Sequence, residues 1–239
     1  MYLQITTKCN MRCIHCAFSC SPNKGEYMQW STFIDAISFA KETEEIISIG
    51  GGEPTIHPRF FDILRHALWT FDYVWFATNG KKTNTMKRLI RIVEEYDCNE
   101  EYNPIILAHE NHLCVALSQD YYHEDINPMI ANYWKKRSRD RRSGYEIRDV
   151  TTSFTGITAQ GRAKRNNLTD TNHCICPGIF INPQGGVKMC GCENSPIIGT
   201  IWSGIEDKWQ EFMNTQEYNN TQCFNEARKD RLQLEIGLH

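Results

Sequence analysis

The sequence lacks long apolar runs and a strong charge of either sign. No stretch approaches the roughly 18 consecutive apolar residues that a membrane-spanning helix needs. Met1 leads directly into Tyr2-Leu3-Gln4-Ile5, without the pattern of a secretory signal peptide. A net charge of −3 gives no general attraction to nucleic acid or to an anionic membrane. We therefore expect a cytoplasmic protein whose partners include neither membrane nor nucleic acid.

The composition is that of an ordinary globular protein. Hydrophobic residues make up 41% of the 239-residue chain and charged residues 23%, which excludes a disordered or fibrous protein. A chain of this length can bury a sizeable core, but two full domains would be cramped. One α/β domain with a short appendage is the expected organisation.

Eleven cysteines are the unusual feature of the composition. Because the sequence has no export signal, a disulfide framework is not expected, and metal binding explains the cysteines better. They form one group near the N-terminus and a second group after residue 173. Only Cys98 and Cys114 lie between the groups, and Cys114, in an apolar run, is expected to be a buried structural thiol.

Short strands and helices alternate along the first half of the chain. The hydrophobic patterns predict strands over residues 2–7, 45–49, 73–77 and 113–117, and helices over residues 31–40 (with Ser31 as the N-cap), 60–69 and 86–96. Each strand ends in a polar or glycine-rich loop. This alternation predicts a parallel sheet with right-handed crossovers, in which ligands bind at the C-terminal ends of the strands.

The rest of the chain gives a weaker pattern. We expect a basic helix over residues 126–142, a strand over 146–154, a polar linker opening at 161–164 and a helix over 205–213. The basic run 135–142 is interpreted as a solvated helix face. A docking patch for an acidic peptide or a nucleic-acid backbone is the alternative. No special role is expected for the scattered histidines His109, His112, His123 and His173, although His173 adjoins Cys174.

Cys9, Cys13 and Cys16 have the spacing C-x3-C-x2-C. Three thiolates in a tight loop suit three corners of a [4Fe–4S] cluster and leave its fourth iron without a protein ligand. A zinc site or three unrelated thiols would be the alternatives, but structural zinc favours paired C-x2-C modules with four ligands. Cys20 could add a fourth ligand, and we interpret it as a bystander.

The segment from Thr7 to Cys16 resembles the C-x3-C-x-Φ-C signature of the radical S-adenosylmethionine (SAM) superfamily, with His15 at the aromatic position. Gly51-Gly52-Glu53-Pro54 is similar to the GGEP element of that family, which receives the amino group of the cofactor's methionine. Glycines allow a close backbone approach, and the Glu53 carboxylate can accept hydrogen bonds from an ammonium group. The resemblance implies cleavage of SAM by a reduced [4Fe–4S] cluster, which yields a 5′-deoxyadenosyl radical that abstracts hydrogen from a substrate.

The same resemblance implies further cofactor-binding residues at the ends of later strands. Asn79, in Thr78-Asn79-Gly80, matches a common ending of the third strand. Ser118 and Asp120 match a fourth-strand ending near the ribose and carboxylate of the cofactor. Residues of these types are also common turn formers, which is the structural alternative.

The C-terminal cysteines resemble the auxiliary-cluster domains known as SPASM and twitch. The similarity rests on Cys174-x10-Gly185-x4-Cys190, on Arg162 in Gly161-Arg162-Ala163, and on the segment 198–202. Arg162 is counted among the cofactor-binding residues. A β-hairpin is expected at 181–187, because its turn glycines would bring two cysteine-bearing segments together.

The auxiliary [4Fe–4S] cluster implied by this resemblance has a predicted ligand set. Its ligands would be Cys174, Cys190, Cys223 and either Cys176 or Cys192. A zinc knuckle made by the two C-x-C pairs is the alternative.

We therefore expect a partial (β/α)6 TIM-like barrel over residues 1–165 and a small twitch- or SPASM-like domain over 166–239. The sequence between Ser118 and Gly161 is short for a six-stranded barrel, so a truncated barrel is the alternative. The expected activity is radical SAM chemistry on a peptide, by oxidation, epimerisation or cross-linking. No residue is singled out as catalytic beyond the binding groups.

Other activities and partners follow from the same resemblance. The alternatives are a sugar- or nucleoside-type substrate, a glycyl-radical activating enzyme and, least favoured, a non-enzymatic zinc module. A reduced flavodoxin- or ferredoxin-type protein is the expected electron donor. Because no peptide-recognition domain precedes Tyr2, we expect another protein or the basic run to hold the leader of a peptide substrate.

Overall fold

The first half of the chain alternates strands and helices as the sequence predicts. A computed structural model describes residues 1–97, 112–140, 143–151, 157, 160–168, 178–192, 195 and 197–203. The elements of the first half are β1 (Tyr2–Thr6), α1 (Trp30–Lys41), β2 (Ile46–Gly51), the 3-10 turn η1 (Pro54–Ile56), α2 (Phe60–Thr70), β3 (Tyr73–Thr78), α3 (Thr83–Asp97), β4 (Leu113–Ser118), α4 (Pro128–Arg137) and β5 (Tyr145–Arg148).

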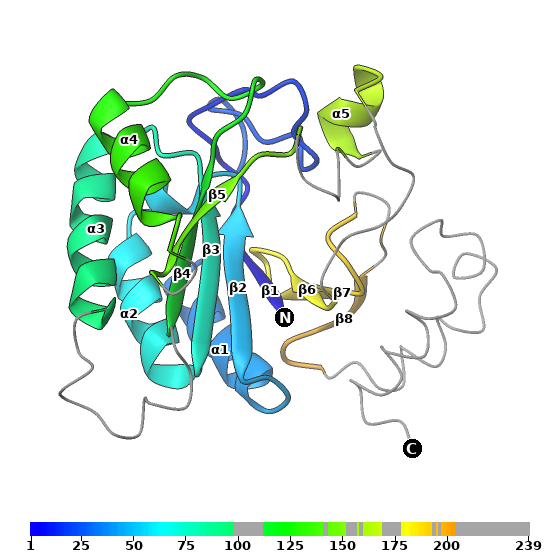
Figure 1. Ribbon diagram of the computed structural model, residues 1–239. Coiled ribbons are helices and arrows are strands. Elements are labelled where there is room, and N and C mark those ends of the chain that lie inside the picture. The colour runs from blue at the N-terminus through cyan, green and yellow to red at the C-terminus, as the bar shows by residue number, and fades with distance from the viewer. Residues whose placement is uncertain are drawn as a thin grey trace.

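Strands β1 to β5 form a parallel array in the order β5-β4-β3-β2-β1. Helices α2, α3 and α4 lie on one face of this array, and the long loop after β1 lies at the end to which the strands point (Figure 1). The burial of β3 alternates accordingly, since Val74, Phe76 and Thr78 are buried while Trp75 and Ala77 are half-buried on the other face. The predicted mixed α/β fold with a parallel sheet is confirmed.

The C-terminal part adds three strands to the same sheet. Its elements are α5 (Gly161–Arg165), β6 (Phe180–Ile181), β7 (Gly186–Lys188) and β8 (Ile197–Thr200). Strand β6 pairs in parallel with β1, and β6, β7 and β8 then pair antiparallel in sequence. The expected hairpin is confirmed, and its hydrogen bonds make it continuous with the N-terminal sheet. The six-stranded barrel, the twitch domain and the boundary at residue 165 stay predictions.

The core lies between the sheet and its helices. Helix α2 buries Ile63, Leu64 and Ala67 at the spacing of an amphipathic helix. In α4, Trp134 is fully buried, and its Nε1 donates a hydrogen bond to the Val115 carbonyl at 3.0 Å. No helix in the described part of the chain is long and apolar enough to cross a bilayer.

Several local expectations were wrong. Helix α1 has Gln29 rather than Ser31 at its N-cap and no capping side chain. Helix α4 begins at Pro128 and not at Ile126, because the Asn127 side chain accepts from the Met129 N–H and the proline supplies a helical φ.

Two further expectations need correction. Residues 161–165 form helix α5 instead of a linker, because Gly161 and Ala163 are buried and the chain packs on the loop after β1. Cys114 is only half-buried, and its thiol lies 3.8 Å from the carboxylate of Glu146. Strand β5 ends at Arg148, and the rest of the strand expected up to residue 154 lies partly outside the described residues, as do Cys98 and the helix expected at 205–213.

Candidate functional site

The loop after β1 carries Cys9, Cys13 and Cys16, and all three side chains line one cavity at the C-terminal ends of the strands. The cavity has a volume of about 190 Å³. Its walls also contain Gly50 to Glu53 at the end of β2, Thr78 and Asn79 at the end of β3, Ser118 at the end of β4, His123 in the loop that follows, and Arg148 in β5. The structure thus brings together most of the residues that the sequence singled out.

The three thiols differ in their proton affinities. Burial raises the pKa of Cys9 to about 11 and the pKa of Cys13 to about 12, and neighbouring negative groups add to both increases. A hydrogen bond from the Cys20 thiol lowers the pKa of Cys16 to about 6. Three thiolates close together in this environment require a nearby positive charge, which iron ions would supply.

Cys20 has a defined role in this arrangement, although we interpreted it as a bystander. Its thiol is buried and is hydrogen-bonded to Cys16, an interaction that raises the pKa of Cys20 together with burial. Cys20 is not among the residues that line the cavity. Cys20 therefore contacts Cys16 from outside the cavity.

Gly51 and Gly52 allow the end of β2 to pass very close to the beginning of the cysteine loop. Gly51 has a φ of +142°, and a Cβ atom there would lie 2.0 Å from the Thr6 carbonyl oxygen. A Cβ atom at Gly52 would lie 2.0 Å from the Lys8 carbonyl oxygen. The Gly52 N–H donates to Thr6 O at 2.8 Å and the Glu53 N–H donates to Lys8 O at 2.9 Å. These bonds hold Glu53 beside the cysteine loop.

The Glu53 carboxylate is almost completely buried and is surrounded by neutral donors. Oε1 accepts hydrogen bonds from the Thr55 N–H at 3.1 Å, the Thr55 hydroxyl at 2.5 Å and the Thr78 hydroxyl at 2.7 Å. Oε2 accepts one from the Asn79 N–H at 2.7 Å. Burial raises the pKa of Glu53, while these bonds act in the opposite direction. No cation pairs with Glu53 among the described residues, so a cationic ligand group would stabilise its charge.

Pro54, Asn79 and Ser118 have different positions relative to the cavity. Pro54 opens η1 and is buried outside the cavity lining. Asn79 lines the cavity, and its Nδ2 donates to Asn10 Oδ1 at 2.8 Å, which ties β3 to the cysteine loop. Ser118 lies in the wall at the end of β4.

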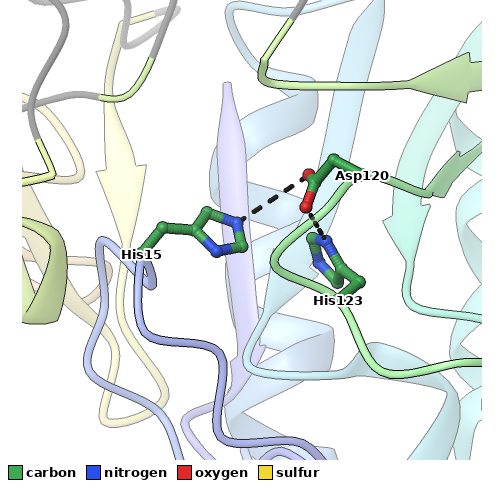
Figure 2. A group of neighbouring side chains, drawn as sticks. All are labelled: His15, Asp120 and His123. Atoms are coloured by element: carbon green, nitrogen blue, oxygen red, sulfur yellow. Dashed lines mark hydrogen bonds and ion pairs between the residues drawn. The ribbon is translucent and has the colours of Figure 1, made fainter.

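His15, Asp120 and His123 form a compact cluster at the mouth of the cavity, with both imidazoles directed at the carboxylate (Figure 2). His123 Nδ1 lies 2.8 Å from Asp120 Oδ1, and His15 Nε2 lies 4.0 Å from Asp120 Oδ2. Burial lowers the pKa of His15 to about 4. Burial acts to raise the pKa of Asp120, but the hydrogen bond and charge of His123 and the Tyr122 N–H outweigh it and lower this pKa. The two histidines line the cavity, whereas Asp120 does not.

Arg162 braces the cysteine loop from outside the cavity. Its Nε donates to the Cys13 carbonyl at 2.9 Å, its Nη2 to the Cys20 carbonyl at 2.6 Å, and its backbone N–H to the Cys16 carbonyl at 2.9 Å. Arg162 does not itself belong to the cavity lining, although Cys13 and Cys16, whose carbonyls it binds, do.

Two of the five C-terminal cysteines can be located. Cys190 and Cys192 are buried after β7, on either side of Gly191, where a Cβ atom would lie 3.3 Å from the ring of Phe18 in the cysteine loop. Cys174, Cys176 and Cys223 lie outside the described residues.

Sequence reasoning missed two residues that shape the cavity wall. Tyr2 lines the cavity, and its hydroxyl accepts a hydrogen bond from the Gly51 N–H at 2.9 Å. His123 was grouped with histidines of no special role, although its position three residues after Asp120 is a spacing at which side chains often meet. Nothing in the local sequence singled out Tyr2.

Comparison with known proteins agrees with this geometry. Residues 3–104 match the family model of the radical SAM superfamily. The match spans the N-terminal part of the chain, under half of its length, and there the chain is similar to the radical SAM superfamily. That similarity implies the use of SAM and of a [4Fe–4S] cluster.

Several known proteins are similar to this chain. The putative peptide biosynthesis protein YydG of Bacillus subtilis is 23% identical over 92% of this chain and 76% of its own length. The mycofactocin maturase MftC of Mycobacterium ulcerans is 32% identical over 34% of this chain and 22% of its own length. A Pyrococcus furiosus protein, the tungsten-containing aldehyde ferredoxin oxidoreductase cofactor-modifying protein, is 35% identical over 34% of this chain and 23% of its own length.

The fold also has a solved counterpart. The crystal structure of BtrN in complex with AdoMet and 2-DOIA superimposes with a TM-score of 0.58 at 12% identity, covering 99% of this chain and 87% of that one. The chain therefore shares the fold of BtrN.

Replacing Arg162 with alanine should loosen the cysteine loop. Loss of the two guanidinium bonds is expected to make local opening easier by about 2 kcal/mol, or roughly thirtyfold in amide hydrogen exchange of residues 13–20. Mass spectrometry of deuterated peptides measures this exchange. Lys164→Ala, an exposed change in the same helix, should leave the rate unaltered, and equal rates in the two variants would contradict the bracing role.

Proposed function

We propose that this radical SAM enzyme cleaves SAM reductively and abstracts a hydrogen atom from a peptide substrate. The observation that carries the proposal is the convergence of Cys9, Cys13, Cys16 and Glu53 on one cavity at the end of a parallel sheet. Three thiols and a buried carboxylate that pairs with no cation in the described part of the chain are the groups that an iron–sulfur cluster and an ammonium group would need there.

The residues fit the cofactors in a definite way. Cys9, Cys13 and Cys16 would ligate three irons, and the fourth iron would stay open to SAM. When bound, the cluster and SAM supply the electron and the carbon-centred radical for hydrogen abstraction. Glu53 would accept hydrogen bonds from the methionine ammonium, and Gly51 and Gly52 let the end of β2 pass close enough to the cysteine loop to place Glu53 there.

The remaining predicted cofactor residues divide into two kinds. His15, Asn79 and Ser118 line the cavity and would contact SAM directly. Pro54, Asp120 and Arg162 do not line it, and we assign them to positioning of the groups that do. Asp120 orients His123, and Arg162 holds the carbonyls of the cysteine loop.

A peptide substrate is supported by the names of two relatives. YydG is named as a putative peptide biosynthesis protein and MftC as a maturase. Oxidation, epimerisation and cross-linking would all begin with the same abstraction. We further propose that a reduced flavodoxin- or ferredoxin-type protein supplies the electron.

The first test is cofactor cleavage by the anaerobically reconstituted, dithionite-reduced protein. We expect slow formation of 5′-deoxyadenosine and methionine without substrate, measured by chromatography. Cys13→Ala should abolish it, because two thiolates are unlikely to retain the cluster. Cys114→Ala, a change in β4 outside the cavity, serves as the control and should leave the rate intact. Wild-type protein with a full cluster and no 5′-deoxyadenosine would refute the proposal.

A second test addresses Glu53. Glu53→Gln keeps the shape but removes the charge, so SAM affinity measured by calorimetry should fall by an amount on the order of 1–3 kcal/mol while iron content stays constant. Thr78→Val is the matched control, since it removes one hydrogen bond to Glu53 and leaves the charge. Equal losses of affinity in both variants would show that Glu53 only organises the turn beside Pro54.

We also propose an auxiliary [4Fe–4S] cluster held by the C-terminal cysteines. Wild-type protein should then contain about eight irons per chain, and a Cys9/Cys13/Cys16→Ala variant about four. Iron, sulfide and zinc analysis under anaerobic conditions gives these numbers. Additional replacement of Cys190, which is fully buried beside the cysteine loop, should remove the residual iron. Zinc without iron in the triple variant would establish a structural zinc site in place of the second cluster.

A further inference from the structure

The cluster of His15, Asp120 and His123 has a composition that cofactor binding alone does not explain. It joins two imidazoles and one carboxylate from two separate loops, and one ligand atom from each residue lies within 4.8 Å of the others. In Figure 2, the two rings lie next to each other and both face the carboxylate, His15 from the cysteine loop and His123 from the loop after β4, with ring centroids 4.9 Å apart.

Two buried polar atoms of this cluster have no hydrogen-bond partner among the residues that the structure describes. They are Asp120 Oδ2 and His15 Nδ1. The Asp120 side chain is fully enclosed, and its other oxygen accepts from the Tyr122 N–H at 2.9 Å and faces His123 at 2.8 Å. A buried carboxylate with one oxygen unsatisfied is costly unless a cation or a donor reaches it. Asp120 Oδ2 faces His15 Nε2, which lies 4.0 Å away.

We propose that His15, Asp120 and His123 bind a divalent transition-metal ion of the Zn²⁺ type. Two imidazoles and a carboxylate are the protein ligands of one class of catalytic zinc sites, in which the fourth position is left to water or a ligand. Zinc bonds of 2.0–2.1 Å in tetrahedral geometry separate neighbouring ligand atoms by about 3.3 Å. The observed separations are 2.8 Å from His123 Nδ1 to Asp120 Oδ1 and 4.0 Å from His15 Nε2 to Asp120 Oδ2, and the ligand atoms lie within 4.8 Å of one another. Rotation of the carboxylate and an inward shift of the His15 ring would complete the site.

The ion would use atoms that the proposed cluster and SAM leave available. It would lie in the ring plane of His15, at Nε2, while the ring itself packs against Tyr122 with a centroid separation of 5.0 Å. When the ion binds Nδ1 of a neutral His123 imidazole, the proton on Nδ1 would move to Nε2 of the same ring. Because His15 and His123 line the cavity, the remaining coordination position would face a carboxylate or carbonyl oxygen of a ligand there.

Zinc binding to the cluster-loaded, full-length protein tests the proposal. With iron on the cysteines, equilibrium dialysis should give one additional Zn²⁺ per chain. Zinc-edge X-ray absorption should show a nitrogen and oxygen shell at about 2.0–2.1 Å. A zinc shell made only of sulfur, at about 2.3 Å, would place the ion on cysteines and overturn the proposal.

Variants identify the ligands. His123→Gln and Asp120→Asn should each weaken Zn²⁺ binding by about tenfold or more. His66→Gln, the same change in α2 away from the cavity, should have no effect. If Asp120→Asn fails to fold by circular dichroism, His123→Gln decides, since His123 lies at the cavity surface. Unchanged affinity in His123→Gln refutes the ion site.

The ion site and the proposed function can fail separately. SAM cleavage by the same preparations is measured in parallel with zinc binding. Cleavage without zinc binding would refute only the ion site, and zinc binding without cleavage would refute only the proposed function.

Discussion

The candidate site depends on the contact between the end of β2 and the start of the cysteine loop. Thr6 and Lys8 offer their carbonyl oxygens to the N–H groups of Gly52 and Glu53, at a distance that no side chain at Gly51 or Gly52 could allow. This backbone contact brings the thiols and the carboxylate into one cavity. The hydrogen bonds of Glu53 to the end of β3 then extend the arrangement across three strands.

Much of the N-terminal fold could be predicted because its signals are local. Alternating apolar residues and strand-ending glycines defined β1 to β4 to within a residue or two. The errors occurred where tertiary contacts decide the conformation. Helix α5 forms because Arg162 and Ala163 pack on a loop about 150 residues earlier in the chain, and no periodicity within five residues could indicate that.

The candidate site also contains some residues that local sequence motifs indicate and others that only tertiary contacts reveal. The cysteines and Glu53 belong to contiguous motifs, so their spacing carried the information. His123 and Cys20 act through side-chain contacts with Asp120 and Cys16, and such contacts depend on how a loop folds rather than on a pattern along the chain. Asp120 was predicted to be a site residue. Its side chain is fully enclosed and therefore acts through its neighbours, which only the three-dimensional structure could show.

The pairing of β6 with β1 has a consequence for the order of assembly during synthesis. Strand β1 lies between β2 and β6, so one of its edges is completed by residues about 180 positions further along the chain. A ribosome moving at about 5–20 residues per second would need on the order of 10 seconds or more to deliver that partner. Until then, β1, which leads into the cysteine loop, would have one unpaired edge. Iron that binds the cysteines at this stage would bind a site whose sheet is still incomplete.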